Sequence, residues 1–191
     1  REHPHCLLKG GPLGPPFFFG TTKMEIETER LLLRQFQEAD FAVYAAMLAD
    51  PDVARFIGGV RDQAGARHHF ESACAHWRDR GFGKFAIEEK ASGHLIGRAG
   101  PTIHADAPDV ELGWTMAKTS WGRGYATEAA WACAAWMFET LSLKEIVSFI
   151  DPANVASVRV AEKLGQSYAR DIVFEAESLR VYAVTLDGFT G

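Results

Sequence analysis

The sequence predicts one α+β domain built on a mostly antiparallel sheet. Residues 84–88 and 95–99 are apolar runs on either side of a turn at Ala91-Ser92-Gly93-His94, a pattern typical of a β-hairpin and hence of antiparallel strands. Residues 109–116 alternate between apolar and polar side chains as a strand does. They lead through a glycine-containing loop into a helix with one apolar face. Sheet and helices are therefore both expected.

The elements before the hairpin follow from local signals. Residues 30–34 predict a strand, and residues 39–48 predict a helix that Pro51 ends. A second helical pattern covers residues 62–80, where Gly81 and Gly83 mark its end. Two helices are therefore expected between the first strand and the hairpin.

The elements after the glycine loop follow in the same way. Residues 145–150 form a short apolar run typical of a strand, and residues 155–164 predict a helix ended by Gly165. Residues 167–175 and 178–186 predict a closing hairpin. The expected order is βααβββαβαββ.

Composition limits the class of protein. A chain of 191 residues with 47% hydrophobic content suits one domain with a sizeable core. The net charge of −5 argues against a nucleic-acid partner. Cys6, Cys74 and Cys133 are odd in number and far apart, so neither a disulfide framework nor a zinc site is indicated, and a reducing cytoplasm fits best.

The N-terminal residues lack periodicity. Residues 1–23 contain the Pro- and Gly-rich run GGPLGPPFFFG, typical of a flexible tail or of sequence upstream of the domain, which is expected to span residues 24–191. No segment is typical of a signal peptide or of a membrane span, so no membrane partner is expected. His68, His69 and His76 share a helix without a well-spaced carboxylate ligand, so exposed or interface positions are expected for them and no metal.

The glycine loop is the strongest local signal. Residues 120–129 read SWGRGYATEA, with Gly122 and Gly124 on either side of Arg123 and an apolar helix directly after them. Glycines so close together indicate positive φ angles or a close approach to the backbone. A helix N-terminus lined by glycine suits a phosphate or pyrophosphate, and Arg123 adds positive charge. The alternative is a tight turn before a buried helix.

Two nucleotide-binding patterns fit this loop poorly. A Walker A loop requires GxxxxGK[ST], and this loop lacks the lysine and the spacing. A dinucleotide-binding fold is a closer alternative, because Gly122 and Gly124 open a helix and Asp151 ends the next strand. Thr127 takes the place of the third glycine, however, and only 40 residues follow Asp151, too few for a doubly wound sheet.

Three motifs together resemble a known family. The strand VELGW at residues 110–114, the loop WGRGYATEA at 121–129, and Asn154 with Ser157 leading into EKLG at 162–165 resemble the GNAT acetyltransferase superfamily. TERLLLR at residues 28–34 is similar to the opening of its ribosomal-protein N-terminal acetyltransferase (RimJ/RimL-like) branch. The resemblance covers roughly residues 24–186.

The resemblance implies a fold and a cofactor. Strands 109–117 and 144–150 would be neighbouring parallel strands that splay apart like a V, with helices on both faces of the sheet and acetyl-CoA in the gap. The loop amides would bind the pyrophosphate, and the pantetheine arm would run beside residues 112–116 as an added strand does. The residues expected at the cofactor are Thr115, Met116, Trp121, Gly122, Arg123, Gly124, Tyr125, Ala126, Thr127 and Asn154.

The chemistry of acetyl transfer selects two further residues. The amine must lose a proton, and Glu111, on the polar face of the strand beside the gap, is the candidate base; its alternative is a solvated strand carboxylate. Glu175 and Glu177 on the closing hairpin are the reserve candidates. The Ser157 hydroxyl would lie near the leaving sulfur, although Asn154 and Ser157 also fit the N-cap and third position of a helix.

The chain departs from the family pattern at three positions. Trp121 stands where Gln or Arg is common, Ala161 stands where many members have a tyrosine acid, and Gln166 replaces a phenylalanine. Only the second departure removes a standard catalytic candidate.

The residues and the resemblance together predict an acetyl-CoA-dependent N-acetyltransferase. Its acceptor would be a primary amine on a small molecule or the α-amine of a protein N-terminus. The alternative is a non-catalytic acyl-CoA-binding module, which the missing tyrosine favours and which Glu111 and Ser157 oppose. The oligomeric state is left open, a homodimer included.

Overall fold

The computed structural model describes residues 24–104, 107–174 and 176–190. The predicted tail at residues 1–23, Cys6 and the reserve base Glu175 lie outside these ranges. No helix of the described residues is long and apolar enough to cross a membrane.

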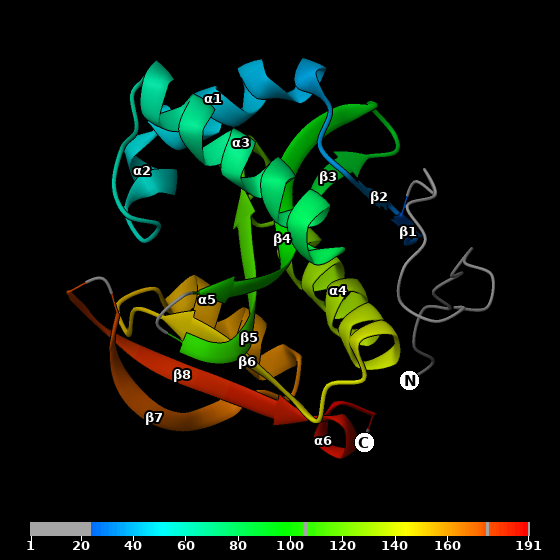
Figure 1. The fold of residues 1–191 in the computed structure, drawn as a ribbon, viewed down its shortest axis with the longest axis vertical. Coiled ribbons are helices and arrows are strands. Elements are labelled where there is room, and N and C mark those ends of the chain that lie inside the picture. Colours follow the sequence, from blue (N-terminus) through cyan, green and yellow to red (C-terminus); the bar gives the residue numbers. More distant parts are fainter. Residues whose placement is uncertain (1–23, 105–106, 175, 191) are drawn as a thin grey trace.

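The sheet contains eight strands in the order β1-β2-β3-β4-β5-β6-β8-β7 (Figure 1). Every neighbouring pair is antiparallel except β5 and β6, which run parallel. The strands are β1 Glu25–Glu27, β2 Leu31–Arg34, β3 Phe85–Glu89, β4 His94–His104, β5 Ala107–Met116, β6 Glu145–Ile150, β7 Ser167–Phe174 and β8 Glu177–Thr185. The mostly antiparallel α+β sheet is therefore confirmed.

The helices begin and end largely at the predicted signals. The Asp62 side chain caps α3 by accepting from the Gly65 N–H, and Gly81 ends that helix with a φ of 76°. The helices are η1 Glu38–Asp40, α1 Phe41–Ala49, α2 Pro51–Ala54, α3 Gln63–Arg80, η2 Lys118–Ser120, α4 Tyr125–Leu141, α5 Val155–Lys163 and α6 Leu186–Thr190.

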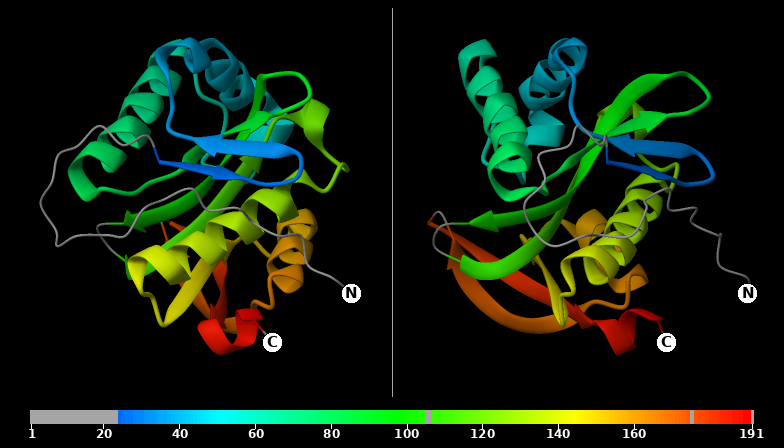
Figure 2. Two further views of the ribbon diagram at one scale, coloured as in Figure 1. Left: turned by 90° about the vertical axis from the view of Figure 1, so that its right-hand side faces the viewer. Right: turned by 45° about the vertical axis from the view of Figure 1, so that its right-hand side comes forward.

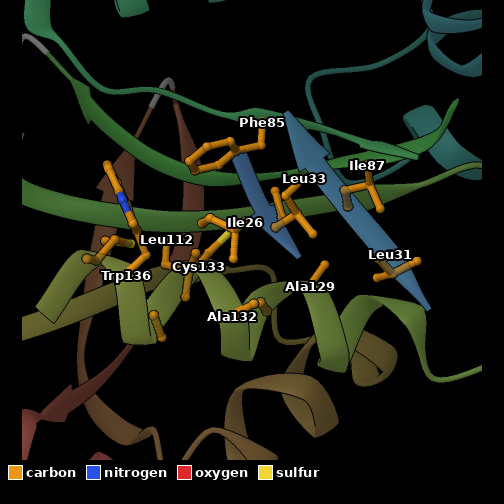
Figure 3. Packing of buried hydrophobic residues seen from close by; sticks show 14 of the residues in the cluster. Ile26, Leu31, Leu33, Phe85, Ile87, Leu112, Ala129, Ala132, Cys133 and Trp136 are labelled. Carbon is orange, nitrogen blue, oxygen red and sulfur yellow. The ribbon is translucent and has the colours of Figure 1, made fainter. Parts of the chain in front are cut away.

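The helices cover both faces of the sheet (Figure 2). On one face α4 packs Ala129, Cys133 and Trp136 against the apolar side chains of β1 to β5 (Figure 3). On the other face α1 and α3 pack Tyr44 and Phe70 over β3 and β4. The sheet is thus buried between two apolar clusters, and burial of this apolar area stabilises the domain.

The sheet parts between its two parallel strands. Among the described residues, Glu111 and Val147 are the one pair of residues that joins β5 to β6 in the sheet. The next side-chain contact is the Ser148 hydroxyl, which donates to the Leu112 carbonyl at 2.7 Å. Beyond this contact β5 still pairs with β4, and β6 still pairs with β8, but β5 and β6 no longer pair with each other. The predicted V-shaped splay is therefore present.

Five elements were not expected: the 3-10 helices η1 and η2, the strand β1 and the short helices α2 and α6. The strand β1 pairs with β2 although three residues are too few to show alternation. Pro51 ends α1 and also begins α2, because proline suits the first position of a helix, and Asp50 caps it. The short helix α6 follows β8, where Phe189 packs on Trp131.

Candidate functional site

Two cavities meet at the mouth of the V. The first, about 530 Å³, lies over β4, β5 and the tips of β7 and β8, and the second, about 420 Å³, lies at the N-terminus of α4. Both are lined by Phe56, Ile57, Trp114, Thr115, Asn154 and Ser157. A ligand in one cavity would therefore reach a ligand in the other.

The second cavity has the features of an anion site. Gly122 and Gly124 have φ angles of 73° and 79°, in the region that glycine adopts without strain. Gly124 is the N-cap of α4 and offers no side-chain cap, and the first helical bond is donated by the Glu128 N–H. The N–H groups of residues 125–127 thus have no partner within the described part of the chain, and the helix dipole adds positive potential there.

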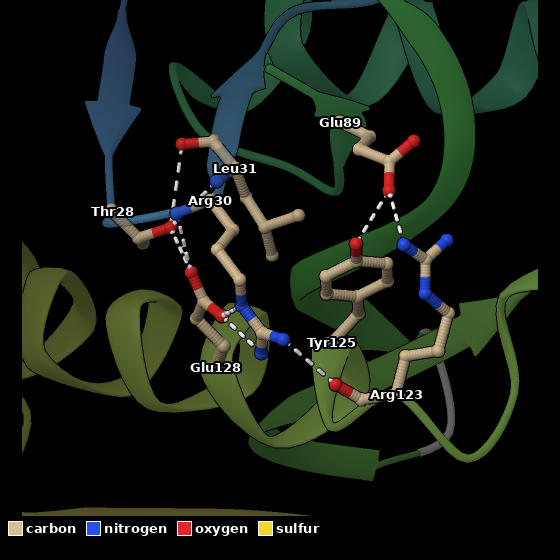
Figure 4. A network of polar contacts seen from close by, with 7 residues as sticks. All are labelled: Thr28, Arg30, Leu31, Glu89, Arg123, Tyr125 and Glu128. Carbon is tan, nitrogen blue, oxygen red and sulfur yellow. Dashed lines mark hydrogen bonds and ion pairs between the residues drawn. The ribbon is translucent and has the colours of Figure 1, made fainter. Parts of the chain in front are cut away.

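A polar network links this loop to residues 28–30, which directly precede β2 (Figure 4). Glu128 accepts from Thr28 Oγ1 at 2.6 Å, from the Arg30 backbone at 3.0 Å and from Arg30 Nε at 2.7 Å. Arg30 Nη1 also donates to the Arg123 carbonyl at 2.9 Å. Arg30 therefore neutralises the carboxylate in the first turn of α4 and fixes the glycine loop.

The loop side chains point in different directions. Arg123 forms an ion pair with Glu89 at 3.0 Å, and the Tyr125 hydroxyl donates to the same carboxylate (Figure 4). Trp121, Gly122, Gly124, Tyr125, Ala126 and Thr127 line the second cavity. The Arg123 side chain is thus held by Glu89, and Arg123 is not among the residues that line the second cavity.

Strand β5 presents backbone groups to the gap. The Leu112 carbonyl faces β6, since Ser148 donates to it. Alternate residues of a strand direct their N–H and C=O groups to the same side, so those of Trp114 face the opening. The Met116 carbonyl accepts from Trp121 Nε1 at 2.9 Å. Trp114 thus joins Thr115 and Met116 as a residue beside the gap.

Asn154 and Ser157 lie together at the mouth of both cavities. The Asn154 side chain accepts from the Ser157 N–H at 3.2 Å and so caps α5. The N-cap interpretation is confirmed, and it leaves the Asn154 side-chain amide NH₂ and the Ser157 hydroxyl able to reach a ligand. Ala161 is fully buried against Ile150 and Tyr182.

Glu111 is paired within the first cavity. Its side chain is 13% exposed, and its Oε2 lies 2.7 Å from His104 Nε2. Burial raises the pKa of Glu111, but Lys84, His104 and Arg98 outweigh that effect and leave the pKa below its usual value. Burial lowers the pKa of Lys84, against the opposing effect of Glu111. The carboxylate is therefore ionised at neutral pH.

Gly113 brings two of these groups together. A Cβ at this position would lie 3.1 Å from Lys84 Nζ and 3.5 Å from Glu111 Oε1. The Lys84 ammonium therefore crosses β5 at the one residue that has no side chain, beside the Glu111 carboxylate.

A second polar chain forms the inner wall of the first cavity. Arg98 Nη1 donates to the Tyr44 hydroxyl at 2.8 Å, and that hydroxyl lies 2.7 Å from His69 Nδ1. Burial, followed by the charges of Arg98 and Arg61, lowers the pKa of His69 to about 3, so the ring is neutral. His69 thus lies in the wall of the cavity, not at the exposed or interface position expected for it.

Motifs in the sequence do not identify His104, Lys84 and Arg98 as site residues. Each lies outside the three motifs, and only the pairing of β3, β4 and β5 gathers them. The strand register shifts between Ile103 and His104, and such a bulge changes the direction of the side chain. No local sequence pattern predicts it. Glu177 lines the same cavity from the β7–β8 tip. No cluster of three or more His, Cys, Asp or Glu suited to a metal is found in the described ranges.

The chain is similar in sequence to known proteins. Residues 30–167 match the family model described as an acetyltransferase (GNAT) domain. The protein YkkB of Bacillus subtilis, which is uncharacterised, is 31% identical over 163 residues, which cover 84% of this chain and 95% of YkkB.

Solved structures share the fold. The acetyltransferase from Agrobacterium tumefaciens is 34% identical with a TM-score of 0.77, and the match covers 90% of this chain and 98% of that one. The spermidine N-acetyltransferase of Vibrio cholerae, solved with CoA and spermine, is 16% identical with a TM-score of 0.70, covering 85% and 99%. The latter is a likeness of fold alone.

Proposed function

The chain belongs to the GNAT acetyltransferase family, and from this membership we propose that it transfers an acetyl group from acetyl-CoA to a primary amine. One observation carries the proposal: the splay between β5 and β6 joins a cavity with a free helix N-terminus to a cavity that holds an ionised carboxylate. The first arrangement suits a cofactor and the second suits a base.

The cofactor would occupy the second cavity. The N–H groups at the start of α4 would bind the pyrophosphate of acetyl-CoA, as at other helix N-termini. The pantetheine arm would pair with the Trp114 backbone, and Asn154 and Ser157 would lie near the thioester sulfur. The Vibrio cholerae neighbour, solved with CoA, is consistent with this cofactor.

The first cavity would hold the amine and receive its proton. A carboxylate whose pKa lies below its usual value, as that of Glu111 does, is a weak acceptor for the proton of an α-ammonium of pKa ~8, whereas an imidazole is ordinarily the stronger base. We therefore assign the base to the His104–Glu111 pair, in which Glu111 holds the imidazole and stabilises its charged form. The departing thiolate, of pKa ~8.5, needs little help, so the lack of a tyrosine at Ala161 is tolerable.

An α-amine is the acceptor that we favour. Deprotonation at pH 7 costs ~1.4 kcal/mol for an α-amine near pKa ~8 and ~4.6 kcal/mol for a lysine-like amine near ~10.4. Similarity to the N-terminal acetyltransferase branch at residues 28–34 supports the same choice. Assignment to that branch and a cytoplasmic location are part of the proposal.

Turnover separates the enzyme from a module that only binds acyl-CoA. The purified chain is mixed with acetyl-CoA and a panel of amines and N-terminal peptides, and free thiol and acceptor mass are followed together. We expect thiol release that depends on an amine, with a matching gain of one acetyl group. Binding of acetyl-CoA without acetylation of any amine would instead support the binding module.

A further inference from the structure

We propose that the acceptor carries an anionic group, a carboxylate or a phosphate, which binds to Arg98, Lys84 and Arg61 in the first cavity. The inference rests on the proposed function, because it names the class of acceptor for that site. It is carried by three cationic side chains that converge on one wall of the cavity.

Arg98 is the centre of this cationic wall. Its side chain is buried, with 4% of the residue exposed, and it lines the cavity from β4. Its contacts are neutral: the Tyr44 hydroxyl, the His69 ring and the Thr115 hydroxyl. No carboxylate of the described chain lies within 4 Å of its guanidinium. A buried guanidinium without an anion is costly, so the site favours a ligand that supplies one.

Lys84 and Arg61 extend the same wall. No ion pair or hydrogen bond of the Lys84 ammonium is found among the described residues, although Glu111 lies nearby. Arg61 donates to the Ile57 carbonyl at 3.3 Å and likewise has no carboxylate partner in the part of the chain described. His69 is neutral and adds no charge. The cavity is also lined by three carboxylates, Glu111, Asp151 and Glu177. The last two follow β6 and begin β8, and neither forms an ion pair with a cation of this wall in the described part of the chain, so the positive charge gathers on one side of the cavity.

The order of these groups along β5 fits an acceptor with a basic end and an acidic end. Arg98 pairs with Thr115, Lys84 crosses at Gly113, and Glu111 follows two residues further on the same face. The amine would lie at the Glu111 end, where the proton is removed. The anionic group would then lie toward Arg98, up to ~13 Å of strand length away.

The cofactor does not account for these cations. Its pyrophosphate has its own site at the N-terminus of α4, and Arg159 and Lys163 line that second cavity. Arg98, Lys84 and Arg61 line the first cavity and not the second. A polyamine, the acceptor class of the Vibrio cholerae neighbour, is poorly suited to a wall of the same charge.

Matched acceptors test the proposal. Glycylglycine is compared with glycylglycinamide, which differs by its uncharged C-terminus, and phosphoethanolamine with ethanolamine; spermidine is the cationic probe. We expect kcat/KM for the anionic member of at least one pair to exceed that of its neutral partner by about 10- to 100-fold, the range of a charge-assisted contact. The favoured pair distinguishes a carboxylate from a phosphate.

Variants locate the anion site. Arg98→Gln and Arg61→Gln should raise KM for the favoured anionic acceptor by about 10-fold or more and leave KM for acetyl-CoA unchanged. Arg61→Gln keeps the test valid if the buried Arg98→Gln variant folds poorly. Arg78→Gln, at an exposed arginine of α3 paired with Asp79, is the matched control and should match the wild type.

The outcomes separate this proposal from the proposed function. Equal turnover of both members of each pair, or an unchanged KM in Arg98→Gln and Arg61→Gln, overturns the anionic acceptor while acetyl transfer stands. If acetyl-CoA binds but no probe is acetylated, acetyl transfer fails instead. Calorimetry with glycylglycine and phosphoethanolamine then tests the anion site directly. If the wild type binds either compound and the Arg61→Gln variant does not, the anion site is supported. If the wild type binds neither compound, the anion site is overturned.

Discussion

Single side chains decide which group removes the amine proton. Glu111→Gln should lower kcat/KM by roughly 10²-fold at pH 7, because the carboxylate that holds His104 is lost, and higher pH should partly restore the rate. His104→Gln keeps an N–H donor near Glu111 but removes the imidazole. We expect a similar loss, measured as kcat/KM in parallel pH–rate profiles.

The pH dependence distinguishes the two members of the pair. The pKa of Glu111 lies below its usual value, so its protonation cannot cause a loss of rate above pH ~5. A limb of the profile above that pH must come from another group. If His104→Gln retains both the wild-type rate and this limb, the imidazole has no part in the reaction and Glu111 acts alone or through water.

Gln166 tests the cost of an unpaired buried amide. The residue is 2% exposed, and neither its Nε2 nor its Oε1 has a hydrogen-bond partner among the described residues. Gln166→Met keeps the length of the side chain and removes both polar groups, so we expect a gain of about 1–3 kcal/mol in the free energy of unfolding, measured in urea. A loss of stability would show that the amide has a partner after all.

At the scale of elements, the loop before α4 is the test of cofactor binding. Gly124→Asp imposes a side chain on a residue with a φ of 79° and places a negative charge at the helix N-terminus. We expect acetyl-CoA affinity, measured by calorimetry, to fall by at least about 100-fold in a variant that still folds.

Gly93 provides the control for backbone strain. It lies in the β3–β4 turn with a φ of 69° and open space around it, so Gly93→Asp carries a similar conformational cost without adding a side chain to α4 or to the loop before it. Its acetyl-CoA affinity should equal that of the wild type. Equal losses in both variants would mean that strain, and not the anion site, explains the result.

Local elements could be predicted from the sequence, and contacts between distant elements could not. The β3–β4 hairpin, the α3 ends and the Asn154 cap depend on neighbouring residues, and all three were predictable. The carboxylate of Glu111 stood out because it lies on a strand beside a recognisable loop. His104 and Arg98 did not, because a bulge and strand pairing bring them to the site. The Arg30–Glu128 bridge spans 98 residues, and TERLLLR alone does not reveal its partner.

At the scale of the whole molecule, His69 makes stability depend on pH. Its pKa is about 3 in the folded chain and ~6.5 in an unfolded one, so the unfolded state binds the proton first. Its contribution is constant above pH ~6.5, and stability falls as the pH drops from there toward 3. His69→Gln should flatten this fall, measured as Tm from pH 7 to pH 4.

The neighbouring histidine is the matched control. His68 is exposed on the same helix, so His68→Gln should leave the slope of Tm against pH as in the wild type. If His69→Gln keeps the wild-type slope instead, the carboxylates and not His69 cause the acid sensitivity.

The parting of β5 from β6 gives the sheet two internal edges. Beyond Glu111 and Val147 the described residues of the two strands do not pair with each other, so their backbone groups on this side lack a strand partner, the kind of surface on which strands of other chains can add. A pantetheine arm in the opening would cover both edges at once. The bound cofactor would then prevent these edges from pairing with strands of other chains. The chain without cofactor would be the form most prone to self-association.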